Sequence, residues 1–78
     1  MLSSIVNVTP MDNYKLKIVL DNGSVAIVNL TRKLITARFG ILKTPSIWEA
    51  VTNNATSINW NNYVSITLSE ALEIMTEH

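Results

Sequence analysis

The sequence predicts an α+β fold with two layers: an antiparallel three-stranded meander plus a fourth strand, with short helices and a C-terminal helix packed on one face. Three observations predict it. Runs rich in β-branched residues fill the first third of the chain, short helical signals follow, and an amphipathic pattern ends it. With 78 residues and 47% hydrophobic content, the chain is expected to form a single domain over residues 1–78.

The first strand is expected over residues 4–10, "SIVNVTP". Its β-branched residues favour a strand, and Pro10 is expected to stop it because proline cannot donate to a sheet ladder. Asp12 and Asn13 then supply the chemistry of a turn.

A β-hairpin is predicted where Asn22-Gly23 separates the runs "YKLKIVLD" and "SVAIVNL". Asn-Gly permits the positive φ angles that both central residues of a type I′ turn require. A two-residue loop places Ile18 opposite Ile27. The apolar face of the hairpin is therefore expected to consist of Tyr14, Leu16, Ile18, Leu20, Val25 and Ile27.

Helical signals follow the hairpin. Residues 31–43 indicate one short helical turn and a second, irregular one, with Gly40 as a breaker. Thr44 suits an N-cap and Pro45 the first helical position. The apolar side of this next helix is expected to contain Ile47, Trp48 and Val51.

The last third of the chain begins with a predicted loop over residues 52–56 and a fourth strand over residues 56–60. A turn at 61–63 comes next. Thr67 and Glu70 form a capping box, which marks the start of an amphipathic helix. Its apolar stripe is expected to contain Leu68, Ala71, Leu72 and Met75.

The formal net charge is zero, which disfavours nucleic acid and membrane as partners. The charges are nevertheless segregated, and this predicts two solvated faces of opposite sign. A weak anion-binding patch and head-to-tail complementarity between molecules are the alternatives. The basic stretch contains Arg32, Lys33, Arg38 and Lys43, and the acidic residues after it are Glu49, Glu70, Glu73 and Glu77.

Catalytic and cofactor chemistry finds little support. The chain has no cysteine, and its only histidine is the terminal His78, where chain ends usually fray. Asp12 and Asp21 lie in predicted turns, and the two glycines are isolated. We therefore expect a protein that is not an enzyme, with no catalytic residues, no cofactor and no metal site.

Localisation follows from what the chain lacks. No segment approaches the ~18 consecutive apolar residues that span a bilayer. The N-terminal "MLSSIVNV" has neither the basic region nor the long apolar region of a signal peptide. A cytoplasmic protein is expected.

Aromatic side chains beside basic ones suggest a second class of function. Single-stranded nucleic acids stack on aromatic rings in basic grooves, so a small-ligand or nucleic-acid-binding domain that uses the basic stretch 32–43 and nearby aromatics is the alternative. Large aromatics in so small a domain usually belong to the core.

Taken together, "IVNVTPMDNYKLKIVLDNGSVAIVNL", "ARFGILKTPSIWEAV", "INW" and the terminal helix resemble a bacterial family, domain of unknown function 2442. The resemblance implies a two-layer α/β fold of three meandering strands, short helices and a further strand. It implies no activity, cofactor or catalytic residues. It also implies that some members are encoded beside small partner proteins, as in toxin–antitoxin pairs. The family pattern favours acidic residues where this chain has Asn29 and, near the end, Ser65, so any role of those carboxylates does not transfer.

The sequence thus favours an uncharacterised non-enzymatic interaction module, antitoxin-like or regulatory, that binds a protein partner. Positive mean hydropathy indicates that some apolar surface is left exposed. Formation of a homodimer is one way to cover it. The candidate partner contacts are Arg32, Lys33, Arg38, Trp60 and Tyr63.

Overall fold

The computed structural model describes residues 4–76 and confirms the α+β class. Met1–Ser3, Glu77 and the predicted tail residue His78 lie outside the described residues. The strands are β1 (Ile5–Met11), β2 (Lys15–Leu20), β3 (Val25–Asn29), β4 (Val51–Asn53), β5 (Ser57–Trp60) and β6 (Val64–Thr67). The helices are the 3-10 turns η1 (Asp12–Tyr14), η2 (Thr31–Ile35) and η3 (Gly40–Lys43), with α1 (Pro45–Glu49) and α2 (Leu68–Thr76).

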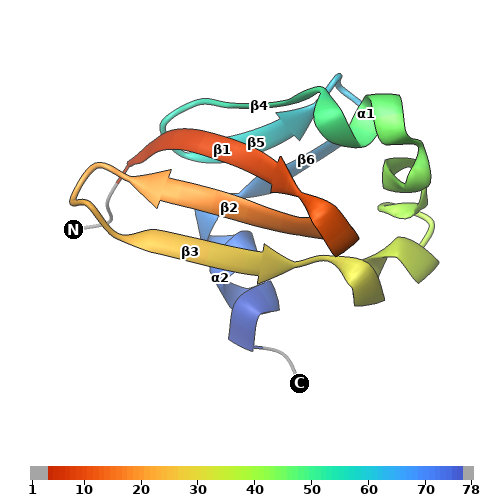
Figure 1. Cartoon of the computed structure of the whole chain (residues 1–78), viewed down its shortest axis with the longest axis horizontal. Coiled ribbons are helices and arrows are strands. Elements are labelled where there is room, and N and C mark those ends of the chain that lie inside the picture. The colour runs from red at the N-terminus through yellow and green to blue at the C-terminus, as the bar shows by residue number, and fades with distance from the viewer. Residues whose placement is uncertain (1–3, 77–78) are drawn as a thin grey trace.

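The strands form two antiparallel meanders of the same topology, sheet A in the order β1-β2-β3 and sheet B in the order β4-β5-β6. In Figure 1 sheet A lies in front of sheet B, with β1 and β4 side by side at the top and α2 emerging below β3. The inner faces of both sheets and the apolar side of α2 share one core. The predicted meander is thus present, and the predicted fourth strand is the central strand of a second sheet.

The hairpin of β2 and β3 has a different loop from the predicted one. Leu20 N–H donates to Ser24 O at 2.9 Å, and Gly23 N–H donates to Leu20 O at 3.0 Å, so the loop has three residues. Within this loop, Gly23 is the one residue with a positive φ, +86°. This is the geometry of a turn followed by a residue in the left-handed region, in which glycine occupies the third loop position.

The extra loop residue shifts the register of β3 by one, which exchanges its two faces. Ile18 pairs with Ala26 and Leu16 pairs with Val28. Leu16 and Ile18 are buried as predicted, but the predicted core positions on β3 are wrong: Ile27 is 42% exposed. The inward residues of β3 are Ala26 and Val28, which are 8% and 0% exposed.

Pro10 does not end β1, which continues to Met11. Pro10 pairs with Leu16. Successive residues of β2 direct their backbone hydrogen bonds alternately to its two neighbouring strands. Since Leu20 bonds to Ser24, the backbone groups of Leu16 also point to β3 and not to β1. The nitrogen of Pro10 therefore faces away from the ladder. Proline is tolerated at such positions of edge strands because no ladder bond is lost.

Two strands of sheet B were not predicted. Val51, expected on a helix, begins β4 instead, since α1 ends at Glu49. β6 alternates buried and exposed residues but has only four of them, and α2 begins at the next residue. Between β5 and β6 the predicted turn is present, with Asn61 and Asn62 both at positive φ, 46° and 66°.

The helices largely follow their sequence signals. Pro45 occupies the first turn of α1, although Thr44 makes no side-chain capping bond. For α2, Thr67 Oγ1 accepts a hydrogen bond from Glu70 N–H at 3.1 Å, as the capping box predicts. The stripe is partly wrong: Met75 is 41% exposed, whereas the buried residues of α2 are Leu68, Ala71 and Ile74.

Within residues 4–76, no helix combines the length and the apolar content that crossing a membrane requires.

Candidate functional site

The two aromatic candidates on the β5–β6 hairpin have opposite environments. Trp60 is 0% exposed, at the centre of the core, so its ring is not available to a partner. The prediction that Trp60 contacts a partner is therefore wrong. Its alternation with Ile58 on β5 points both side chains inward. Tyr63, in the turn, is 60% exposed and does present its side chain to solvent.

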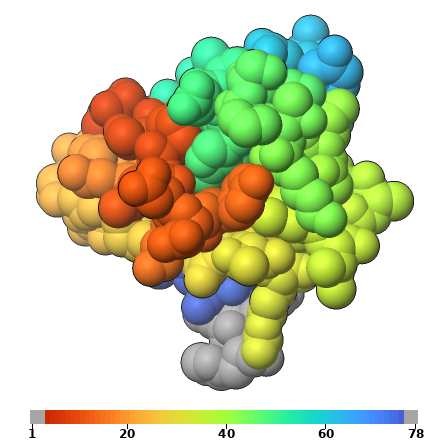
Figure 2. All heavy atoms as spheres, turned by 45° about the vertical axis from the view of Figure 1, so that its right-hand side comes forward, coloured from red at the N-terminus to blue at the C-terminus, as the bar shows by residue number. Residues whose placement is uncertain are grey.

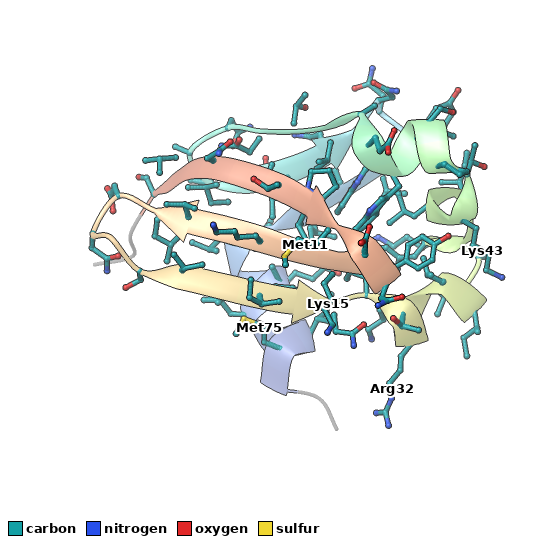
Figure 3. The ribbon with its side chains drawn as sticks, in the orientation of Figure 1. Met11, Lys15, Arg32, Lys43 and Met75 are labelled. Atoms are coloured by element: carbon teal, nitrogen blue, oxygen red, sulfur yellow. The ribbon has the colours of Figure 1, made fainter. Side chains whose placement is uncertain are left out.

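The basic candidates also differ from one another. Arg32 is exposed, and its side chain extends away from the body of the molecule (Figure 3). Lys33 is half-buried. Arg38 forms a bidentate ion pair with Glu70 of α2, in which Nη2 lies 3.0 Å from Oε1 and Nη1 contacts Oε2. The structure thus separates the exposed Arg32 from an arginine that is already engaged.

Arg38 ties three parts of the chain together. Besides pairing with Glu70, its Nη2 donates to Ser65 O on β6 at 2.6 Å, and its guanidinium carbon lies 4.9 Å from the centre of the Phe39 ring. The hydrogen bond from Arg38 lowers the pKa of the Glu70 carboxyl, an effect that desolvation opposes and the positive charges of Arg38 and Lys33 reinforce. This arginine therefore acts as a structural link between the irregular segment, β6 and α2.

A hollow of about 250 Å³ lies at this link, and charges of both signs line it. The positive charges belong to Lys33 and Arg38, and the negative charges belong to Glu70 and Glu73. Two residues of the basic stretch and two of the later acids thus meet here, rather than lying on separate faces. Because carboxylates repel phosphate, this arrangement gives little support to an anion site.

Three aromatic rings form a column across the core. Tyr14 packs edge-on against Trp48 with ring centres 5.4 Å apart, and Trp48 stacks on Trp60 at 5.9 Å. Trp48 Nε1 donates to Met11 O at 3.3 Å, and Tyr14 hydroxyl donates to Lys43 O at the same distance. The column fixes the end of sheet A against α1 and sheet B.

A second hollow, of about 310 Å³, lies over this column between residues 10–14 and residues 45–49. Figure 2 shows these orange and green segments meeting on one face. Asn13 and Tyr14 are both in the left-handed region there, with φ of 63° and 58°. Since Trp48 is only 7% exposed, the hollow exposes little of the ring that forms its floor.

The outer face of sheet A combines lysines with exposed apolar side chains. On it Lys17 lies between Thr9 and Ile27, and Lys15 lies between Met11 and Asn29. Figure 3 shows Met11 and Lys15 on this face. Its apolar members are exposed or half-exposed: Met11 at 39%, Ile27 at 42%, Val25 at 53%, and Val19.

The outer face of sheet B has a different chemistry. Thr52, Asn59 and Ser65 form one cross-strand row, and Ser57 pairs with Thr67 in the next. These side chains are polar and uncharged, as expected of a surface that water covers. The outer face of sheet A is therefore the surface of the two that combines charge with apolar area, and we take it as the candidate site.

No protein-family model, no curated protein and no solved structure matches this chain. The resemblance to domain of unknown function 2442 accordingly stays a prediction.

The two positions at which this sequence departs from that family pattern have clear structural roles. Asn29 Oδ1 accepts a hydrogen bond from Thr31 N–H at 2.9 Å, which turns the chain from β3 into η2. Ser65 contributes its backbone carbonyl to Arg38. Neither role needs a carboxylate.

The outer face of sheet A could have been found from the sequence only with the correct register. The alternation Lys15-Leu16-Lys17-Ile18 places both lysines opposite the buried residues. The exposure of Val25 and Ile27 depends on the three-residue loop, for which the signal is the glycine at the third loop position.

Proposed function

We propose that this protein is a non-enzymatic interaction module that binds a protein partner through the outer face of sheet A. The observation that supports it is the composition of this uncovered face, where two lysines on the central strand are flanked by exposed Met11, Val25 and Ile27. Val19 pairs with Val25, and Ile27 follows two residues later on the same face of β3, so these three side chains form an apolar group beside the lysines. Exposed apolar patches are typical of protein-binding surfaces. An antitoxin-like or regulatory role is the physiological form of this proposal.

The chemistry of the face specifies the partner. The partner surface should be apolar where it meets Val25 and Ile27, and it should carry carboxylates that pair with Lys15 and Lys17. Arg32 and Tyr63 lie outside this face and are secondary candidates, as is the half-buried Lys33.

Binding of nucleic acid or a small anion through residues 32–43 has weaker support. Arg38 is paired with Glu70, and Phe39, Trp48 and Trp60 are each less than 8% exposed. A binding groove for single strands needs rings that bases can stack on.

Site-specific photo-crosslinking tests the proposal. A benzophenone side chain replaces Lys17 on the outer face of sheet A or, as the matched control, Thr52 on the outer face of sheet B; both positions are exposed. After irradiation in the native host, position 17 should give a discrete adduct with another protein, and position 52 should not. An excess of untagged wild-type chain should compete for this adduct, and the Lys15→Glu, Lys17→Glu double variant should not. Equal labelling from both positions, or competition by the double variant, would contradict the proposal.

A further inference from the structure

We propose that two copies of this chain join edge to edge through β3, antiparallel about a two-fold axis beside Ile27. This inference rests on the proposed function, because it names a second copy as the occupant of the edge that borders the binding face. The joint lies in the plane of sheet A, so it leaves the outer face free for another partner.

The backbone of β3 offers the required hydrogen bonds. The Leu20–Ser24 pair is hydrogen-bonded, so bonding to β2 alternates and falls on Ala26 and Val28. The N–H and C=O groups of Val25, Ile27 and Asn29 consequently point away from β2. Within residues 4–76, no hydrogen bond from another segment reaches these backbone groups.

The other sheet edges are protected. β1 carries Pro10 and an irregularity between Ile5 and Asn7, and its Ile5 N–H donates to Ala55 O at 2.8 Å, next to β4. On β4, Asn53 Nδ2 reaches Ile5 O at 3.4 Å. On β6, the carbonyl of Ser65 is occupied by Arg38. Proline, bulges and covering contacts are the devices by which proteins prevent edge pairing.

Among residues 4–76, β3 has no proline, no bulge and no hydrogen bond to its outward backbone groups, although α2 packs against the strand. Its sequence "VAIVN" contains no charge and no proline, and it pairs with β2 without a register shift. A free edge of this kind pairs readily with another strand. Since β3 carries no charge, an acidic or basic strand gains nothing from it, whereas a second β3 is an equally neutral and apolar match.

An axis beside Ile27 uses the whole strand. It pairs Ile27 with Ile27 of the second copy and Val25 with Asn29, so that each outward-pointing backbone group finds a partner. The lysines of β2 in the two copies then lie three strand spacings apart, about 14 Å, which exceeds the ~8 Å Debye length at physiological salt. Their mutual repulsion is accordingly small. The result is a continuous six-stranded sheet with a doubled outer face.

Charge substitution at the axis tests this arrangement. Ile27→Lys places two like charges directly opposite each other, which destabilises a strand pair. Met11→Lys is the matched control, because Met11 is 39% exposed on the opposite edge strand and Ile27 is 42% exposed. By sedimentation equilibrium, we expect the wild type and Met11→Lys to dimerise at micromolar concentration and Ile27→Lys to dimerise at least about tenfold more weakly.

Mixing two oppositely charged variants distinguishes a lost dimer contact from a failure to fold. Ile27→Glu should also be a weak dimer by itself, and mixing it with Ile27→Lys should restore association, because opposite charges then face each other across the axis. Circular dichroism checks that each variant is folded. Restoration by mixing supports the joint.

A wild-type chain that sediments as a folded 8.7 kDa monomer at high micromolar concentration overturns this inference. So does equal weakening by Met11→Lys and Ile27→Lys. If the chain is a monomer but position 17 still crosslinks to another protein, the dimer is contradicted and the proposed function is not. If the chain is a dimer but position 17 crosslinks to no other protein, the proposed function is contradicted and the dimer is not.

Discussion

Sheet A and sheet B have the same three-stranded antiparallel topology, but the chain uses them differently. Sheet B contributes the fully buried Ile58 and Trp60 to the core, is polar on its outer face and has an edge bound by Arg38. Sheet A buries Leu16 and Ile18 equally well, but its outer face is partly apolar, and no hydrogen bond within residues 4–76 reaches the outward backbone groups of β3. Topology alone therefore does not determine which surface is available to a partner; side chains at the outer face and edge do.

The hairpin loops of the two sheets differ in which of their residues take positive φ. Asn22-Gly23 is the stronger signal for a type I′ turn, yet only Gly23 takes positive φ there. Asn61 and Asn62 both take positive φ without a glycine. Asparagine tolerates the left-handed region better than most residues, so Asn-Asn can fulfil the requirement that Asn-Gly was expected to fulfil.

Within sheet B, the division between core and surface predicts a large difference in stability between two substitutions. Trp60→Ala should lower the free energy of unfolding by about 3–5 kcal/mol, because it removes a fully buried ring and leaves a cavity beside Trp48. Tyr63→Ala, three residues later and 60% exposed, should change it by less than ~0.5 kcal/mol. Urea denaturation of both variants measures this difference, and similar losses in the two would contradict the assignment of Trp60 to the core.

A smaller effect tests the hairpin of sheet A. Gly23→Ala should cost about 1–2 kcal/mol, because alanine is strained at a φ of +86° although its Cβ would meet no atom within 4 Å. Gly40→Ala is the matched control: its φ is not positive, and its Cβ would lie 3.6 Å from Leu34 O, an ordinary contact. That variant should be neutral or stabilised by up to ~1 kcal/mol. Thermal unfolding measures both, and a loss of stability confined to Gly40→Ala would refute the loop geometry.

The smallest effect concerns the Arg38–Glu70 link that protects sheet B. Arg38 and Glu70 are 49% and 32% exposed, so Glu70→Gln should cost only about 0.5–1 kcal/mol at neutral pH. Because folding lowers the pKa of Glu70, its contribution is present above the usual glutamate pKa of about 4.3 and is lost as pH falls through the lower folded value.

The wild type and Glu70→Gln should therefore converge in stability as the solution is acidified, which denaturant titrations between neutral and acidic pH can measure. Glu49→Gln, at an exposed position of α1, is the control, and its free energy of unfolding should stay close to that of the wild type. A difference between the wild type and Glu70→Gln that stays constant down to pH 2 would refute the link.

Features with local causes were predictable. The capping bond between Thr67 and Glu70 forms as the sequence indicates, and Pro45 starts α1. The alternation of Leu16 and Ile18 also predicts two buried positions correctly. In each case residues a few positions apart determine the outcome, so no knowledge of the rest of the fold is needed.

Features that depend on distant partners were not predictable. β4 and β6 have only three and four residues, and they become strands because β5 lies between them with free backbone groups on both sides. Arg38 and Glu70 are 32 positions apart and meet only after α2 has packed.

Local sequence signals are enough to predict an α+β fold with a β-hairpin near the start of the chain and a capped helix near its end. Which face of β3 is buried, where Arg38 binds and which sheet edges are covered depend on contacts between distant segments. Turns and caps are stabilised by neighbours in the chain, whereas register, burial and edge protection are stabilised by segments that meet only in the folded protein.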